Sequence, residues 1–270
     1  MPYHELSDET RIFYTDAGDG PPALLLHGWT CDGNDWSWQA PELEHRYRVL
    51  TVDQRGHGHS DAPRGSYQPQ LLADDAAELL KALAPGQAAV VFGHSMGAVV
   101  ASALAVRHPG LVAALVLVDP VYNIPDDETG PVIDAMDAMP PPAVAVTVFE
   151  SAFYTPDTPA FLKAWHRRRI LATPDHVVAG CLRDLYTGEE GIGRAAIAGE
   201  YLRQRAVPRI AVYRSEPAAE LERALPLGES DEIHVLEGGH FPHQQKPAEF
   251  NGLVLGWLDR ISAGSGTGSR

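Results

Sequence analysis

Short apolar segments alternate with longer helical patterns along most of this chain. The apolar segments have the length expected of strands; they span Ile12–Thr15, Ala23–Leu26, Arg48–Val52, Ala88–Phe92, Leu115–Val118, Arg209–Tyr213 and Ile233–Leu236. The helical patterns cover Gln70–Leu83, Ser95–His108 and Ala248–Ile261. This alternation predicts an α/β fold, in which helices cover a mostly parallel sheet.

The segment 121–205 breaks the alternation. It opens with Asp126, Asp127 and Glu128, contains three consecutive prolines at 140–142, and holds no convincing strand. Its helical patterns lie at Thr147–Phe153, Phe161–Leu171, Val177–Leu185 and Ile192–Leu202. We therefore predict a core formed by residues 1–120 and 206–261, a helical cap of residues 121–205 over the strand ends, and a flexible Gly/Ser/Thr-rich tail of residues 262–270.

Composition and charge exclude several classes of partner. The 270 residues include 36 acidic and 21 basic ones, a formal net charge of −15. Binding to nucleic acid or to an anionic membrane needs a basic surface, so we expect neither partner. Cys31 and Cys181 lie far apart in the sequence and are compatible with a reducing compartment. No signal-peptide pattern or long apolar stretch is visible, which predicts a cytoplasmic protein.

The pentapeptide Gly93–Gly97 carries the first chemical signal. It reads Gly-His-Ser-Met-Gly and stands between a strand-like segment and a helical one. In this context a Gly-x-Ser-x-Gly motif forms a strained turn that exposes the hydroxyl of its central residue, here Ser95. The two glycines are needed because side chains would collide across the bend. We predict that Ser95 is a nucleophile.

A serine nucleophile needs a base, and His240 is the strongest candidate among twelve histidines. His240 follows the last predicted strand, in the sequence Glu-Gly-Gly-His-Phe-Pro. The two glycines suit a tight loop that returns an imidazole toward Ser95. The alternative is an ordinary loop histidine.

Together these features resemble the α/β-hydrolase superfamily. The resemblance rests on His27-Gly28-Trp29, on the polar loop from Asp53 to Ser60, on the pentapeptide, and on Gly239-His240, in matching order and spacing. It implies a mostly parallel eight-stranded sheet with helices on both faces. It also implies an oxyanion hole formed by the backbone N–H groups of Trp29 and Met96, which would stabilise a tetrahedral intermediate.

The acid of the triad departs from the usual pattern of the superfamily. Members commonly carry Gly-x-x-Asp after the strand that follows the cap, but here that strand is followed by Arg214-Ser215-Glu216-Pro217. A second position in the superfamily is the end of the strand after the nucleophile helix, where this chain has Asp119. We favour Asp119 as the acid and keep Glu216 as the alternative, with Glu220 or another carboxylate behind them.

This displaced acid is similar to that of zearalenone-type lactone hydrolases and of cofactor-free dioxygenases that open heteroaromatic rings. Their C-terminal histidine stands in a context like Gly-Gly-His-Phe-Pro, and their Pro/Glu-rich loop is similar to 215–220. The similarity covers short segments only.

An apolar pocket is expected near Ser95, since aromatic residues are frequent in the predicted cap and around the oxyanion loop. The candidate lining residues are His27, Tyr122, Phe153, Trp165 and Phe241. His57 and His59 lack accompanying acidic or cysteine ligands, and no dinucleotide or phosphate-loop motif is present. We therefore expect no metal and no cofactor, and a small-molecule substrate as the partner; a homodimer is left open.

The sequence thus predicts a serine hydrolase acting on an ester or lactone of a mainly apolar molecule. Two alternatives remain. One is a cofactor-independent dioxygenase that uses His240 and Asp119 as a base toward an aromatic substrate. The other is a small-molecule receptor with slow turnover on the same fold.

Overall fold

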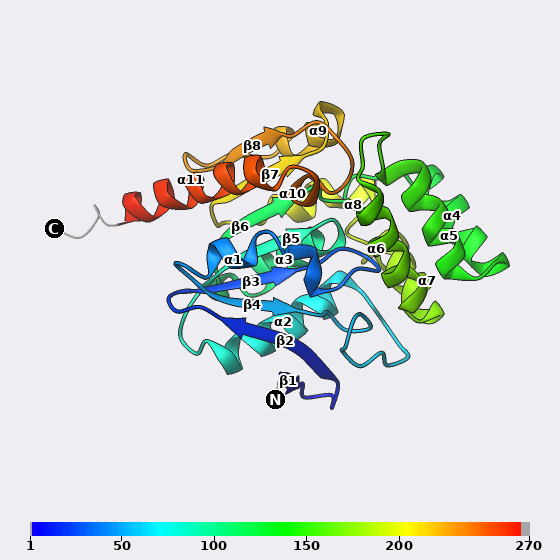
Figure 1. Cartoon of the computed structure of the whole chain (residues 1–270), viewed down its shortest axis with the longest axis horizontal. Helices are drawn as coiled ribbons and strands as arrows, with labels where there is room; N and C mark the ends of the chain where they lie inside the picture. The colour runs from blue at the N-terminus through cyan, green and yellow to red at the C-terminus, as the bar shows by residue number, and fades with distance from the viewer. Residues whose placement is uncertain (1, 266–270) are drawn as a thin grey trace.

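The computed structural model describes residues 2–265 and contains an eight-stranded sheet between two layers of helices (Figure 1). The strand order is β1-β2-β4-β3-β5-β6-β7-β8. The strands are β1 (Tyr3–Glu5), β2 (Arg11–Ala17), β3 (Pro22–Leu26), β4 (Arg48–Val52), β5 (Ala89–His94), β6 (Val112–Val118), β7 (Arg209–Tyr213) and β8 (Glu232–Val235). All neighbouring pairs from β4 to β8 are parallel, whereas β2 is antiparallel to both of its neighbours, β1 and β4. The predicted α/β fold with a mostly parallel eight-stranded sheet is confirmed.

Each face of the sheet has its own apolar core. Leu24 and Leu26 of β3 face the core beneath α2 and α3, and Leu25 faces the opposite core with Trp257 of α11. This alternation follows from the two-residue period of a strand, and burial of both faces explains why the strands read as apolar runs. The elements around the sheet are η1 (Gly33–Trp36), α1 (Ala40–Leu43), α2 (Pro69–Leu83), α3 (Met96–Arg107), η2 (Pro109–Leu111), α9 (Glu216–Ala224), α10 (Pro242–Gln245) and α11 (Pro247–Ser265).

The C-terminal helix is longer than the sequence pattern indicates. α11 runs to Ser265 and so includes the first part of the segment predicted as a flexible tail. The remainder of that segment, 266–270, lies outside the described residues.

The described residues between β6 and β7 form helices and no sheet strand. These helices, hereafter the inserted helices, are α4 (Asp126–Ala138), α5 (Pro141–Val148), the short π-helix η3 (Phe149–Phe153), α6 (Ala160–Ala172), α7 (Asp175–Tyr186) and α8 (Ala195–Leu202). Prolines at 125, 140, 159 and 174 immediately precede α4 to α7. Their rings fix φ at a helix-compatible value, −53° to −62° here, while their ψ of 118° to 145° keeps them outside the helix that follows. In Figure 1, α4 to α7 stand together at one end of the sheet.

That end is where the carboxyl ends of the parallel strands meet. Ser95 follows β5, Asp119 follows the adjacent β6, and His240 follows β8. Crevices at the carboxyl ends of such strands are the usual ligand sites of α/β sheets. None of the helices within residues 2–265 is long and apolar enough to cross a membrane.

Candidate active site

Ser95 occupies a strained turn between β5 and α3. Its backbone has φ 54° and ψ −117°, a conformation that L-residues rarely adopt. A Cβ on Gly93 would lie 2.3 Å from the carbonyl oxygen of Gly97, and one on Gly97 would lie 2.3 Å from that of Leu26. Both glycines therefore have a steric reason, as the motif predicted.

Three side chains from distant segments converge at this turn. The Nε2 of His240 lies 2.8 Å from the Oγ of Ser95, and its Nδ1 lies 2.5 Å from the Oδ2 of Asp119. All three residues are at most 4% exposed. Asp119 stands at the end of β6 with φ 39°, and its N–H donates to Val212 across the sheet. The residues have the connectivity and distances of a nucleophile, a base and an orienting acid.

The alternative acid lies elsewhere. Glu216 is the first residue of α9, its side chain is 67% exposed, and it pairs with Arg223 at 2.8 Å. Glu220 is also exposed. The second oxygen of Asp119 accepts the backbone N–H of Arg214 at 3.1 Å, so the residue that replaces the usual glycine here helps to hold Asp119.

The surroundings keep His240 neutral near neutral pH. Burial lowers the pKa of His240 to about 4, an effect that the hydrogen bond and charge of Asp119 oppose and that His94 and Arg214 reinforce. A neutral imidazole can accept a proton from Ser95 at Nε2. The nearby Asp119 carboxylate would stabilise the imidazolium that results.

A cavity of about 220 Å³ opens beside Ser95, and both Trp29 and Met96 line it. Met96 is the first residue of α3, so its N–H has no acceptor within the helix. The indole of Trp29 donates to the carbonyl of Val178 in α7 at 3.0 Å, which fixes the loop after β3. Both residues predicted to supply oxyanion donors therefore line the same cavity as Ser95.

The cavity is mainly apolar and built largely by the inserted helices. Phe153 lines it as predicted, and its ring centroid lies 4.1 Å from that of His240. Lining residues that the sequence reasoning missed are Val121, Ile124, Glu128, Thr129, Val132, Val148, Ala152, Cys181, Leu182, Leu185, Tyr186 and Arg214. The amphipathic pattern of 177–185 could have indicated the α7 members, since the apolar face of that helix had to pack against other apolar groups, here including α4 and α5.

Four other predicted pocket residues do not line this cavity. Each of them has other contacts. His27 is fully buried and accepts the backbone N–H of Gln54 through Nε2. Tyr122 is turned into the core, where its hydroxyl donates to Glu222 at 2.5 Å. Phe241 packs instead on His166, with ring centroids 4.1 Å apart.

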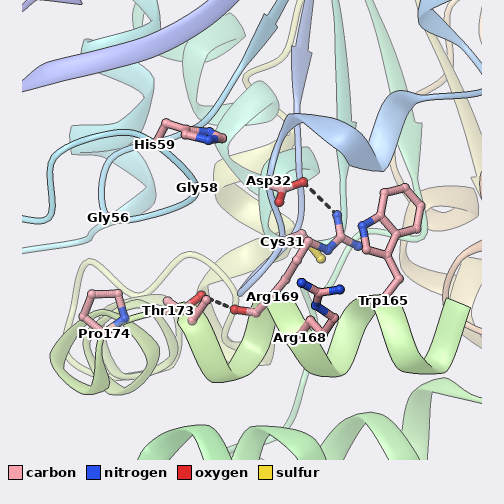
Figure 2. A pocket seen from close by; sticks show the side chains of 11 residues that line it. Cys31, Asp32, Gly56, Gly58, His59, Trp165, Arg168, Arg169, Thr173 and Pro174 are labelled. Atoms are coloured by element: carbon pink, nitrogen blue, oxygen red, sulfur yellow. Dashed lines mark hydrogen bonds and ion pairs between the residues drawn. The ribbon is translucent and has the colours of Figure 1, made fainter.

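The fourth, Trp165, lines a different hollow. This second hollow measures about 480 Å³ and lies between the end of α6 and the loops after β3 and β4 (Figure 2). The guanidinium carbon of Arg169 lies 4.7 Å from the Trp165 ring centroid. Ser95 is not among the residues that line this hollow.

One group of described residues has the ligand types of a metal site. Ligand atoms of Asp35, His94 and His243 lie within 4.8 Å of one another, and all three residues are buried. However, Arg169 lies 2.9 Å from the Oδ1 of Asp35, and this guanidinium would repel a metal cation at that carboxylate. The arrangement fits a charge-paired cluster better than a metal centre.

Comparisons with known proteins agree with this architecture. A model of the family described as "Alpha/beta hydrolase family" matches residues 23–253. The chain is 44% identical over 119 residues to a non-heme chloroperoxidase of Streptomyces lividans, and this match spans 43% of each protein. It is 30% identical to the magnesium-chelatase 30 kDa subunit of Rhodobacter capsulatus over 92% of this chain and 90% of that protein. The crystal structure of an enol-lactonase from Burkholderia xenovorans LB400 has the same fold, with a TM-score of 0.82 at 22% identity over 96% of this chain and 100% of that one.

Proposed function

Because the chain belongs to the α/β-hydrolase family, we propose that it is a serine hydrolase that cleaves an ester or lactone of a mainly apolar small molecule. The observation that carries the proposal is the continuous contact from Ser95 through His240 to Asp119 at the mouth of an apolar cavity. The enol-lactonase of the same fold supports a carbonyl substrate of this kind.

In this proposal the Oγ of Ser95 attacks the substrate carbonyl while its proton passes to the Nε2 of His240. The backbone N–H groups of Trp29 and Met96 donate to the resulting oxyanion, an interaction worth about 3 kcal/mol for each donor. Asp119 stays ionised: it accepts a hydrogen bond from the Nδ1–H of His240 and stabilises the imidazolium.

The tetrahedral intermediate then collapses to an acyl-enzyme on Ser95. His240 returns its proton to the leaving alkoxide, and afterwards deprotonates a water molecule that attacks the acyl carbonyl. The second tetrahedral intermediate then expels the Oγ of Ser95, which takes this proton back from His240. Hydrolysis of an ester yields an acid and an alcohol. For a lactone the alkoxide remains attached to the acyl group, so the product is a single hydroxy acid.

Steady-state hydrolysis by the full chain and by Ser95→Ala tests this proposal. We would use p-nitrophenyl esters of increasing chain length together with a series of lactones. We expect turnover by the wild type and a loss of about 10⁴-fold or more in the variant. Oxygen consumption with aromatic substrates that survives Ser95→Ala would instead support the dioxygenase, and a single burst without steady turnover would support the receptor.

A further inference from the structure

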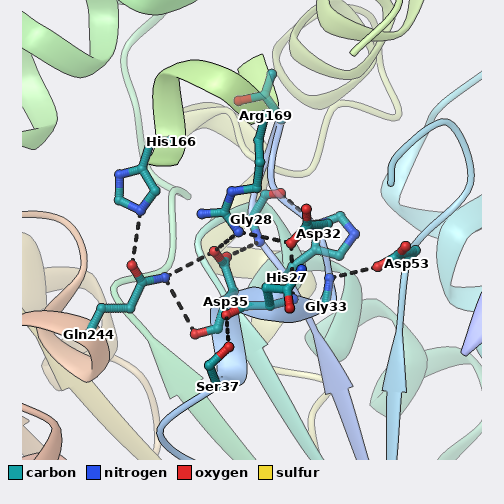
Figure 3. Close-up of polar contacts among 12 residues, drawn as sticks. His27, Gly28, Asp32, Gly33, Asp35, Ser37, Asp53, His166, Arg169 and Gln244 are labelled. Atoms are coloured by element: carbon teal, nitrogen blue, oxygen red, sulfur yellow. Dashed lines mark hydrogen bonds and ion pairs between the residues drawn. The ribbon is translucent and has the colours of Figure 1, made fainter. Parts of the chain in front are cut away.

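A fully buried carboxylate lies behind the triad and contacts four different segments. Asp35, in η1, is 0% exposed. Its Oδ1 accepts from Arg169 at 2.9 Å and from the amide of Gln244 at 3.0 Å. Its Oδ2 faces the N–H of Gly28 and the Nδ1 of His94, each at 3.3 Å. Figure 3 shows Arg169 and Gln244 approaching Asp35 from separate elements.

His94 connects this carboxylate to the catalytic histidine. It is the residue directly before Ser95, and it is 1% exposed. Its Nε2 lies 2.9 Å from the backbone carbonyl oxygen of His240, and its Nδ1 faces Asp35. A carbonyl and a carboxylate both accept hydrogen bonds, so the two contacts are satisfied together only when both ring nitrogens donate. The geometry therefore favours a positively charged His94 beside a negatively charged Asp35.

The neighbours of Asp35 keep its carboxylate ionised. Burial opposes the charge, but Arg169, His94 and His243 outweigh that effect and hold the pKa of Asp35 well below its usual value. A buried ion pair is seldom favourable by itself, because both charges lose their hydration. Its presence against the backbone of the catalytic histidine suggests a role beyond stability.

The inserted helices supply part of this cluster. Arg169, in α6, bonds both Asp32 and Asp35, while its Nε and Nη2 are buried with no hydrogen-bond partner among the described residues. From the preceding turn of α6, His166 contacts the Oε1 of Gln244 at 2.9 Å (Figure 3). Separation of α6 from the sheet would therefore leave Asp35 without its guanidinium partner.

We propose that Asp35 and His94 form a second buried acid–base pair that positions the backbone of His240, and that Arg169 makes this pair depend on the docked inserted helices. The inference rests on the proposed serine hydrolysis. Asp35, His94 and Arg169 are positioning residues, because the contacts described for them join them to the triad's backbone or to one another and not to the cavity beside Ser95.

The pair also places a charge near the catalytic imidazole. The rings of His94 and His240 have centroids 4.9 Å apart. A positive charge at this distance disfavours protonation of His240, so loss of the charge should move the acid limb of the pH profile to higher pH. The titratable or charged groups around His94 are Asp35, Arg169, His166, His240 and His243.

The test measures the second-order rate constant for labelling of Ser95 by a fluorophosphonate, from about pH 3 to pH 8, so that the acid midpoint lies inside the range. His94→Phe keeps a ring without a donor, and we expect labelling to fall by about tenfold to a hundredfold. In His94→Gln the side-chain amide can still donate to the carbonyl of His240, so this variant should be labelled roughly fivefold faster than His94→Phe. It carries no charge, so its acid midpoint should rise by roughly one pH unit. A purely structural role would not produce this shift.

Asp35→Asn should slow labelling as His94→Phe does. The matched control is Glu222→Gln, which neutralises another fully buried carboxylate, one that pairs with Arg205 and Arg209 away from the triad. We expect the control to lose thermal stability but to keep the wild-type labelling rate and pH midpoint. Arg169→Gln should also reduce the labelling rate. The double variant Arg169→Gln/Asp35→Asn should be labelled little more slowly than either single variant, because both changes remove the same contact between Arg169 and Asp35.

Two results would overturn the inference. One is wild-type labelling in folded Asp35→Asn and His94→Phe proteins. The other is a loss of labelling rate in Glu222→Gln that equals the loss in Asp35→Asn when the two variants have the same melting temperature. If the wild type itself is not labelled at Ser95, the proposed function fails as well; labelling of the wild type with unaffected variants refutes the positioning pair alone.

Discussion

Replacement of Asp119 by asparagine tests the unusual position of the acid. In the structure Oδ1 of Asp119 accepts the backbone N–H of Arg214 at 3.1 Å, and Oδ2 accepts from the Nδ1 of His240 at 2.5 Å. An asparagine would keep its oxygen toward the Arg214 N–H and turn its NH₂ group toward Nδ1. Nδ1 must then accept, which moves the ring proton to Nε2, where it faces Ser95.

The wrong tautomer cannot remove the proton of Ser95. We therefore expect kcat to fall by about 10⁴-fold, the magnitude known for this change in a serine triad, or about 5.5 kcal/mol in activation free energy. Steady-state ester hydrolysis measures the loss, and thermal unfolding of the variant shows whether the fold is intact. Binding of substrate should change little, so the effect should lie in kcat rather than KM.

The matched control is Glu216→Gln. It makes the same chemical change at the other candidate acid, which is exposed and pairs with Arg223. We expect activity within about twofold of the wild type, since exposed ion pairs contribute little. A large loss in Glu216→Gln together with an active Asp119→Asn would refute the assignment of Asp119.

Three further predictions concern pH, the nucleophile turn and the cavity. Because burial lowers the pKa of His240 to about 4, kcat/KM should be retained as the pH falls from neutral and be lost through about pH 4; a midpoint near the ordinary histidine value of 6.5 would contradict this. Gly93→Ala should destabilise the fold by about 3 kcal/mol in urea unfolding, since its Cβ would lie 2.3 Å from the Gly97 oxygen; unchanged stability would show that the turn can relax. Cys181→Phe should narrow the 220 Å³ cavity, so kcat/KM should fall about tenfold or more for long acyl chains and change little for acetate esters; equal effects on both would place the acyl chain elsewhere.

Most of the sheet and the convergence of Ser95, His240 and Asp119 could be predicted from the sequence. Strands buried on both faces give strong apolar runs, and the serine motif imposes a local geometry that only glycine neighbours permit. Asp119 directly follows β6, and His240 stands in the loop after β8. Parallel strands bring such positions to one edge of the sheet. Short exposed elements such as β1 lacked a signal because few of their residues are buried.

The cavity wall was less predictable. The side chains of Tyr122 and Phe241 were expected in the pocket, but neither lines the cavity beside Ser95. Their directions depend on partners distant in sequence, Glu222 for Tyr122 and His166 for Phe241. Sequence spacing gives the place of a residue along an element but not which of two cores its side chain enters. Arg169 shows the same limit, since it stands in a run of three arginines, 167–169, and nothing in that run indicates that its side chain is buried against Asp35.

The central claim is that Ser95 is an activated nucleophile, and mass spectrometry after treatment with a fluorophosphonate tests it most directly. The account predicts one covalent adduct per chain, mapped to the peptide that contains Ser95 and absent from Ser95→Ala. An unlabelled wild-type protein, or an adduct on another residue that persists in Ser95→Ala, would contradict it.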